Sequence, residues 1–512
     1  MRTDRNFLQS LFSLTIFPMV FFGISLSLPA HAADLDAYLE QATKFETVTM
    51  NSVGQRFEPQ QTIAPNAPPR HVSNYDLTLQ WTPKKDLVQE NWQLNTIYPF
   101  PNRLKFKADY HSHGGVREGR DGFRPNLGGS ISAARAGAVI KDLWLSNPLI
   151  LMSHAGLGAE GFKAGADGTP FTFTAFETQW TVTLDKETNL PSKLITVESD
   201  PLEGSLVNAV TFADWRMIGD TPFPFRLEQT IGDRLIRREV RQSIVLDSDE
   251  NQSTLSNRQT NEEQDNDEKI IDQNTILAER NRGWSMSHFF LRRALIGGPS
   301  DGDESANVQI NSIGDGIYQI VGSSHHTIVI EGRKGLALVD AAWYPRRSKA
   351  VLAAIRKKWR RKPIKYVILT HHHIDHVGGL QTFADLGTTI VTGVGNFEYF
   401  YNILIKTTKN PPSMQPVDKR LSISGIGKTI ELFDIPNSHA DDMIGIYVPD
   451  SKTVINTDLY SPGRPTQQPV WASEFASAIS FHGLDVERHV GSHGSGAEPH
   501  DNLVKLVSGK NK

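Results

Sequence analysis

The stretch Val367–Gly379 reads VILTHHHIDHVGG and places four histidines and one aspartate within six positions, His371 to His376. The residues directly before the histidines, VILT, are apolar or β-branched, which is typical of a buried strand. Neutral imidazole is the commonest protein ligand for metal ions near neutral pH, and loops at the carboxyl edge of a sheet often gather ligands. The stretch therefore predicts a metal site on a loop that follows a strand.

The sequence around this stretch alternates between segments typical of strands and segments with the spacing of helices. From about Asn307, short strands are expected in GIYQIVG, HTIVIEG and LALVDAAW, a helix in RRSKAVLAAIRKKW, a strand in IKYVILT, a helix around GLQTFADL and a strand in TIVTG. Strands that alternate with helices predict an α/β domain. We place this domain at residues 307–512.

Further metal-ligating residue types occur far from the histidine cluster. Asp340 ends LALVD, His439 lies in IPNSHADDM, Asp458 ends TVINTD and His493 lies in VGSHG. Together with the pattern H-x-H-x-D-H, these motifs resemble the signature of the metallo-β-lactamase superfamily, and they occur in that superfamily's order over residues 307 to 509. The resemblance implies an αββα sandwich with a metal site along one edge. The usual form G-H-T is missing around His439.

The resemblance also implies a ligand set for two metal ions. It assigns His371, His373 and His439 to one ion, and Asp375, His376 and His493 to the second. Asp458 would bridge the two ions, and Asp375 is also the catalytic candidate because it could hold both a metal ion and the nucleophile. Nitrogen and carboxylate ligands without thiolate suit zinc, with iron or manganese as alternatives. The chain has no cysteine, which excludes lactamases with a cysteine ligand.

Other residues near these motifs allow two interpretations each. Asp340 either orients the ligand loop or caps a turn, and His325 and His326 either face the site or belong to a loop. His372 and Ile374 are expected to be spacers that face away from the metal ions. The remaining residues are interpreted structurally: His111 and His113 as an exposed turn, and His489 as part of the strand before His493. Asp441 and Asp442 are interpreted as solvent-exposed, with lining of the pocket as the alternative.

The first 32 residues have the layout of a secretory signal peptide. Arg2 and Arg5 precede the apolar run FLQSLFSLTIFPMVFFGISLSL, and Ala30 and Ala32 flank His31 in PAHAAD. This layout predicts cleavage after Ala32 and export to the periplasm without a stable membrane anchor. The alternative is an uncleaved anchor, because the apolar run approaches the length that spans a bilayer.

Residues 33–246 read differently from the α/β domain. Apolar and polar residues alternate in segments such as NYDLTLQW, RLKFKADYH and RREVRQSIVL, without long helices between them. This pattern predicts a mainly antiparallel β domain. Residues 247–306 begin with a strongly polar segment, DSDENQSTLSNRQTNEEQDNDEK, and are interpreted as a linker followed by a connecting helix.

Size and charge limit the possible functions. The 512 residues exceed what one hydrophobic core usually holds. The 53 basic and 57 acidic residues nearly balance, which argues against a nucleic-acid partner. We therefore expect an exported zinc hydrolase that uses a metal-bridged hydroxide to cleave an ester, lactone, amide or lactam in a small molecule, with protein partners left open. The alternatives are an envelope binding protein with the metal domain as scaffold, and a mononuclear iron oxygenase.

Overall fold

The computed structural model describes residues 35–42, 44–120, 128–157, 168–246, 307–322, 324–464 and 467–509. The expected signal peptide, and the expected linker with its connecting helix, lie outside these residues. Within the described ranges, none of the helices has the length and apolar character needed to cross a membrane.

The first domain is built on one antiparallel sheet of twelve strands in its described part. Their order across the sheet is β6-β5-β4-β3-β2-β1-β12-β11-β10-β9-β8-β7, so most neighbours are consecutive in the chain. The strands are β1 (Val48–Glu58), β2 (Arg70–Thr82), β3 (Leu87–Thr96), β4 (Asn102–His111), β5 (Gly114–Gly119), β6 (Gly128–Ile131), β7 (Phe171–Ala175), β8 (Thr178–Leu184), β9 (Pro191–Asp200), β10 (Gly204–Ile218), β11 (Thr221–Ile231) and β12 (Arg234–Leu246). The predicted antiparallel β domain is confirmed.

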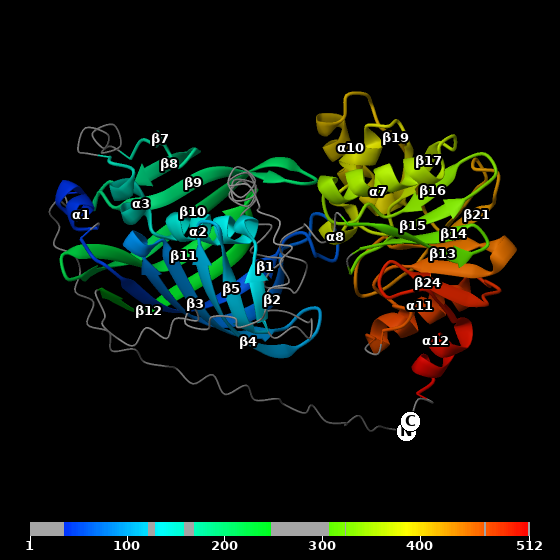
Figure 1. Ribbon diagram of the computed structural model, residues 1–512, viewed down its shortest axis with the longest axis horizontal. Helices are drawn as coiled ribbons and strands as arrows, with labels where there is room; N and C mark the ends of the chain where they lie inside the picture. Colours follow the sequence, from blue (N-terminus) through cyan, green and yellow to red (C-terminus); the bar gives the residue numbers. More distant parts are fainter. Residues whose placement is uncertain are drawn as a thin grey trace, which may run out of the picture.

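Alternation along the strands sorts their side chains between two faces. In β3, Val88, Trp92 and Leu94 are buried while the intervening Asn91 and Gln93 are exposed. Successive side chains of a strand point to opposite faces, so this pattern places one face against the core. The helices α1 (Leu35–Gln41), α2 (Ala133–Ser146) and α3 (Pro148–His154) accompany this sheet, and α2 and α3 lie against one of its faces (Figure 1).

The helix α2 differs from the prediction of strands without long helices between them. It begins after Ser132, whose Oγ accepts a hydrogen bond from the backbone N–H of Arg135 at 3.3 Å. Thirteen of its fourteen residues are buried, including Arg135 and Lys141. A helix buried all round has no solvent-exposed face, so burial of α2 depends on tertiary packing around it.

The second domain contains two sheets that pack face to face. One has the order β13-β14-β15-β16-β17-β18-β19 and the other β20-β21-β22-β23-β24-β25. The strands are β13 (Gln309–Gly314), β14 (Ile317–Val321), β15 (Thr327–Glu331), β16 (Leu336–Val339), β17 (Ile364–Ile368), β18 (Thr389–Gly393), β19 (Ser413–Val417), β20 (Arg420–Ile423), β21 (Ile430–Asp434), β22 (Ile444–Val448), β23 (Thr453–Asn456), β24 (Arg488–Gly491) and β25 (Ala497–Pro499). Val339 and Ile368 of the first sheet share one buried core with Ile446 and Ile455 of the second.

Helices cover the outer faces of both sheets. The helices are α7 (Pro345–Lys358), α8 (Ile374–Val377), α9 (Gln381–Ala384), α10 (Val394–Thr407), α11 (Pro469–Phe481) and α12 (His500–Val507). Ile355 of α7 and Phe400 of α10 belong to the same core as Leu338 of β16, whereas Phe475 of α11 packs with Val454 of β23. The layers are therefore helix, sheet, sheet and helix, which confirms the αββα sandwich.

Candidate metal centre

The candidate ligands follow strands whose carboxyl ends meet at one edge of the sandwich. β16 pairs in parallel with β17, and β23 pairs in parallel with β24. Asp340 follows β16, the histidine cluster follows β17, Asp458 follows β23 and His493 follows β24. Parallel strands end at the same side of a sheet, so chain segments far apart in sequence converge there.

Two glycines allow the histidine loop to approach the core closely. The short helix α8 carries Asp375 and His376, and its end packs against the loop after β16. A Cβ atom on Gly378 would lie 1.8 Å from the carbonyl oxygen of Trp343, and one on Gly379 would lie 2.0 Å from Ser348 Oγ. Real Cβ atoms do not approach other atoms so closely, so only glycine fits at both positions without rearrangement.

One group of ligand atoms comes from His371, His373, His439 and Asp458. Each residue offers one atom, and these atoms all lie within 4.8 Å of one another. Asp458 Oδ2 is 2.9 Å from His439 Nε2 and 3.3 Å from His371 Nε2. All three histidines are buried, so the group is shielded from bulk water.

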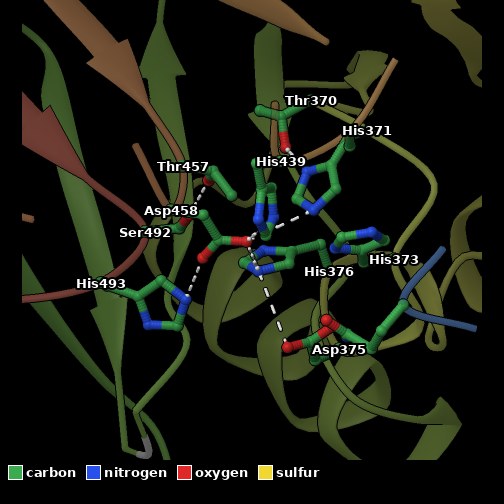
Figure 2. A network of polar contacts seen from close by, with 12 residues as sticks. Thr370, His371, His373, Asp375, His376, His439, Thr457, Asp458, Ser492 and His493 are labelled. Atoms are coloured by element: carbon green, nitrogen blue, oxygen red, sulfur yellow. Dashed lines mark hydrogen bonds and ion pairs between the residues drawn. The ribbon is translucent and has the colours of Figure 1, made fainter. Parts of the chain in front are cut away.

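A second group comes from His325, His376 and His493, again with ligand atoms within 4.8 Å of one another. Asp458 connects this group to the first. Its Oδ1 is 2.6 Å from His493 Nε2, and its Oδ2 is 3.2 Å from His376 Nε2 (Figure 2). Asp458, a member of the first group, thus also contacts the second group, as the resemblance implied for a bridging carboxylate.

Asp375 lies beside the second group rather than within it. Its Oδ2 is 3.9 Å from His376 Nε2 and 3.0 Å from His325 Nε2. Its Oδ1 accepts a hydrogen bond of 2.5 Å from Gln61 Nε2. The structure therefore brings all seven sequence-predicted residues together, with Asp375 at the rim, and adds His325, whose position the sequence left open.

The hydrogen bonds of the histidine rings test whether the site suits metal ions. Among the candidate ligands, three ring nitrogens are buried and make no hydrogen bond: His371 Nε2, His373 Nδ1 and His376 Nε2. The first and the third lie 3.3 and 3.2 Å from Asp458 Oδ2. The opposite nitrogen of each ring is engaged, by Thr370 Oγ1 at 3.1 Å, by the Thr62 carbonyl at 2.8 Å and by Asp340 Oδ2 at 3.2 Å respectively. Buried polar atoms normally find partners, and ligating histidines typically use one nitrogen for the metal and the other for such a contact. The residues fit metal ions.

The electrostatics of the site agree with this fit. Burial lowers the pKa of His371 to about 4 and the pKa of His373 well below its ordinary value. Both rings are therefore neutral near pH 7, which is the form that binds metal. Burial also acts on His376, but the carboxylates of Asp458 and Asp375 outweigh it and raise the pKa of His376 well above its ordinary value. These carboxylates thus favour positive charge at this place.

Asp340 orients the ligand loop, which resolves one of the open alternatives. It is fully buried and has a positive φ of 61°. Its Oδ1 accepts hydrogen bonds from the backbone N–H and the hydroxyl of Thr370, both at 2.9 Å. Its Oδ2 accepts from Thr457 Oγ1 at 3.0 Å and lies 3.2 Å from His376 Nδ1. One carboxylate therefore fixes both ends of the histidine loop.

The remaining residues of interest occupy structural positions. His372 points its Nε2 to Thr62 Oγ1 at 3.3 Å, consistent with a spacer between the ligand candidates. His326 Nε2 lies 2.8 Å from the Gly494 carbonyl. His489 is part of β24 as predicted. His111 ends β4, and its ring stacks on that of His113 with centroids 5.6 Å apart.

Sequence reasoning missed the contribution of the first domain. Gln61, Thr62 and Tyr98 contact Asp375, His373 and His439 respectively. These contacts join residues more than 300 positions apart, and the segments that carry them have no motif. No signal in a single sequence could have found them.

A family model described as "Metallo-beta-lactamase superfamily" matches residues 320–470. This match identifies residues 320–470, within the second domain, as a region of the metallo-β-lactamase superfamily. Superfamily relatives match only part of this chain. The "2,4-dinitroanisole O-demethylase subunit alpha" of Nocardioides sp. (strain JS1661) is 26% identical over 202 residues, which cover 38% of this chain and 58% of that protein. The "Metallo-beta-lactamase type 2" of Bacillus cereus is 24% identical over 24% of this chain and 45% of its own length.

Two further matches are a second kind of curated enzyme and a solved structure. The "Linear primary-alkylsulfatase" of Pseudomonas sp is 40% identical over 73 residues, which cover 14% of this chain and 11% of that protein. Among solved structures, a metallo-β-lactamase from Pontibacter korlensis aligns with 40% of this chain and 100% of its own, with 17% identity and a TM-score of 0.32. The chain therefore spans about half the length of the first curated superfamily relatives, which are enzymes of more than one kind.

Proposed function

We propose that the protein is a metal-dependent hydrolase that holds two zinc ions at the edge of its αββα sandwich. The main support for the proposal is that His371, His373 and His376 each have a buried ring nitrogen that makes no hydrogen bond, and that these residues belong to two groups of ligand atoms joined by Asp458. Nitrogen and carboxylate ligands without thiolate suit zinc. The family match supports metal binding at this fold but not the identity of the metal.

The ligand atoms divide between two ions. The first ion would be held by His371, His373 and His439, and the second by Asp375, His376 and His493, with Asp458 between them. His325 Nε2 is near enough to join the second set, since its ligand atom lies within 4.8 Å of those of His376 and His493. In the present geometry it instead lies 3.0 Å from Asp375 Oδ2.

The chain's own residues prepare the site for attack by water on a substrate carbonyl or related centre. Bound zinc supplies hydroxide near neutral pH and polarises the substrate oxygen. Asp375 is held from two sides, by Gln61 and His325, so its carboxylate is fixed as an acceptor for a proton of the attacking water. Orientation of this kind lowers the barrier because the reacting groups need no further ordering.

The substrate class proposed is a small molecule with an ester, lactone, amide or lactam bond. An aromatic wall supports an apolar portion in the substrate: the ring of Trp471 lies 4.5 Å from that of His439, and Tyr98 and Phe100 flank Trp471 at 6.3 and 6.4 Å. Two relatives are named for activity on alkyl sulfates and on 2,4-dinitroanisole, so alkyl sulfates and methoxylated nitroarenes are further substrates to test.

Metal analysis combined with a substrate panel tests this proposal. Purified full-length protein should contain about two equivalents of zinc and hydrolyse at least one of lactams, lactones, aryl esters, alkyl sulfates and methoxynitroarenes. His371→Ala should lose metal and activity, whereas the exposed His113→Ala should keep both. Absence of stoichiometric metal contradicts the proposal. One equivalent of iron with oxygen consumption favours the mononuclear oxygenase instead.

We also propose that residues 1–32 direct the protein to the periplasm. The support is the sequence alone, with its basic start, apolar run and A-x-A site. N-terminal sequencing of protein from a periplasmic fraction should begin at Ala33. Recovery of intact protein starting at residue 1 in the membrane fraction contradicts this proposal and favours an anchor.

A further inference from the structure

A connection of the first domain reaches the metal domain beside the candidate ligands. β1 ends at Glu58 and β2 begins at Arg70, and the segment 59–69 between them extends towards α8 (Figure 1). The Gln60 carbonyl accepts a hydrogen bond from the backbone N–H of Ile374 at 3.3 Å, and the Ile63 carbonyl accepts one from Asp441 at 2.6 Å. These bonds tie the connection to the loops that carry Asp375 and His439.

The buried part of this connection is polar, which is unusual for a mere linker. Gln60, Gln61 and Thr62 have exposed fractions of 4%, 7% and 1%. Buried polar side chains are costly unless they find hydrogen-bond partners. Here the side chain of Gln61 finds a candidate ligand, since its Nε2 donates to Asp375 Oδ1 at 2.5 Å. The backbone carbonyl of Thr62 contacts a second one, at 2.8 Å from His373 Nε2.

The second of these contacts fixes the tautomer of His373. A carbonyl oxygen can only accept, so the proton of a neutral His373 ring lies on Nε2 and the lone pair lies on Nδ1. Nδ1 is the buried atom without a partner. The backbone of the first domain thus selects the ring nitrogen that faces the other candidate ligands.

A third contact comes from a separate part of the first domain. Tyr98, just after β3, places its hydroxyl 3.0 Å from His439 Nδ1, while His439 Nε2 faces Asp458 at 2.9 Å. With Nε2 as the ligand atom, Nδ1 carries the proton of the ring and donates a hydrogen bond to the Tyr98 oxygen. Arg70 lies over the Tyr98 ring at 4.2 Å and donates to the His439 carbonyl at 3.2 Å, which holds the two residues together.

The first domain holds this connection in place through its own fold. Gln60 Nε2 donates to Asp200 Oδ2 at 2.8 Å and lies 3.2 Å from Glu203 Oε1, both at the turn between β9 and β10. Arg234 at the start of β12 pairs with Glu203 at 2.7 Å. The position of Gln61 and Thr62 therefore depends on three strands of the first domain.

We propose that the first domain completes the metal centre, with Gln61, Thr62 and Tyr98 as positioning residues for Asp375, His373 and His439. The inference rests on the metal binding in the proposed function, but not on any particular reaction. Contacts of this kind, one step removed from the metal, typically contribute 10- to 100-fold to metal affinity or activity. The first domain is therefore part of the enzyme's active centre rather than an independent recognition module.

Matched substitutions in the full-length protein test the proposal. Tyr98→Phe and Gln61→Met remove the hydroxyl and the amide that contact the candidate ligands. Tyr75→Phe and Gln89→Met serve as controls, since they remove the same groups from bonds within the first domain, to Glu239 at 2.7 Å and to Asp109 at 3.1 Å. Cobalt-substituted protein gives two readouts independent of turnover: the visible absorption of bound Co²⁺, and its dissociation constant from competition with a chelator.

We expect Tyr98→Phe and Gln61→Met to weaken cobalt binding by about 10- to 100-fold and to change its absorption spectrum. The controls should keep the wild-type spectrum and affinity even where the unfolding temperature falls. Equal spectra and affinities in all five proteins overturn the inference while leaving the proposed function intact. A wild-type protein that binds cobalt but hydrolyses no substrate overturns the function alone, and one that binds no cobalt overturns both.

Discussion

Two of the clusters of buried ionisable side chains in the described part of the chain differ in how their members pair. In the first domain, Arg237 of β12 bonds Asp142 of α2 at 2.7 Å and Ser146 Oγ at 2.6 Å, and Tyr75 donates to Glu239 at 2.7 Å. Opposite charges there bind each other. In the metal centre, ring nitrogens of four histidines instead lie within 3.3 Å of the single carboxylate of Asp458.

The pKa shifts express the same difference. Although burial opposes them, Asp142 and Glu239 raise the pKa of Arg237, and Arg237 lowers the pKa of Glu239. Both groups therefore stay charged and paired. At the metal centre, burial keeps His371 and His373 neutral, so their lone pairs remain available. His376 is the exception, because the carboxylates of Asp458 and Asp375 raise its pKa. The metal centre therefore differs from the Arg237 cluster in its neutral histidines rather than in having no charge pairing.

The largest effect is expected at the point where the two ligand groups meet. Asp458→Asn keeps the shape of the side chain but removes the charge that lies within 3.3 Å of four histidines. We expect a loss of metal and at least a ~10³-fold fall in kcat/KM, because a catalytic metal contributes several kcal/mol. Metal analysis and steady-state kinetics measure both. Asp485→Asn, at an exposed position, is the control, and retention of full metal content in Asp458→Asn contradicts the assignment.

Substitutions in the cluster around Arg237 should change the stability of the protein rather than its metal content. Arg237→Ala leaves Asp142 and Glu239 buried without their main partner, and such changes typically cost about 3–5 kcal/mol. Hydrogen exchange of β12 amides measures this loss within the first domain. The double substitution Arg237→Met with Asp142→Leu should recover much of it, since an apolar pair of similar volume replaces the charges. A double variant as unstable as the single one contradicts this account.

The second domain was largely predictable because its signals are local. The apolar residues of β16 and β17 and the polar residues that follow each strand are adjacent in sequence, and the parallel pairing of strands brings them together. The superfamily resemblance, and with it the expected sandwich, followed from the order of four further residues: Asp340, His439, Asp458 and His493. His325 could not be placed, because one histidine in a loop carries no periodic or motif signal.

The first domain was predictable only in its strands. Alternation revealed strands such as β3 and β12, but the sequence analysis did not identify α2, which is buried almost all round. The contacts of Gln61, Thr62 and Tyr98 with the metal domain depend on how two folded domains meet. Such contacts follow from tertiary structure, and nothing in their local sequence specifies them.

A buried histidine outside both clusters gives a smaller, pH-dependent effect. His489 of β24 packs between the rings of Tyr460 and Phe475, and its Nε2 lies 2.8 Å from His500 Nδ1. Burial, aided by His500, lowers the pKa of His489 to about 3.

The sign of the pH effect follows from this shift. The unfolded chain binds a proton near pH 6.5 that the folded protein does not bind until about pH 3. The contribution of His489 to stability is therefore complete above pH 6.5 and is lost as the pH falls towards 3, by at most about 1.4 kcal/mol per pH unit. His489→Leu should show a shallower loss of unfolding free energy between pH 6 and 4. If the unfolding free energy of the wild-type protein and of His489→Leu falls equally steeply with pH, the role given to His489 is wrong.

The smallest effect is expected at the neighbour of Arg237 on the same strand. Arg238 Nε lies 2.8 Å from Glu228 Oε2, nearly the distance of the Arg237–Asp142 pair, but its side chain is 56% exposed against 5% for Arg237. Exposed ion pairs contribute about 0–1 kcal/mol because water and salt screen them and because two long side chains must be ordered. Arg238→Ala should therefore lower the unfolding free energy by less than about 1 kcal/mol, and added salt should abolish the difference. A loss as large as that of Arg237→Ala would show that distance, rather than burial, determines the strength of these pairs.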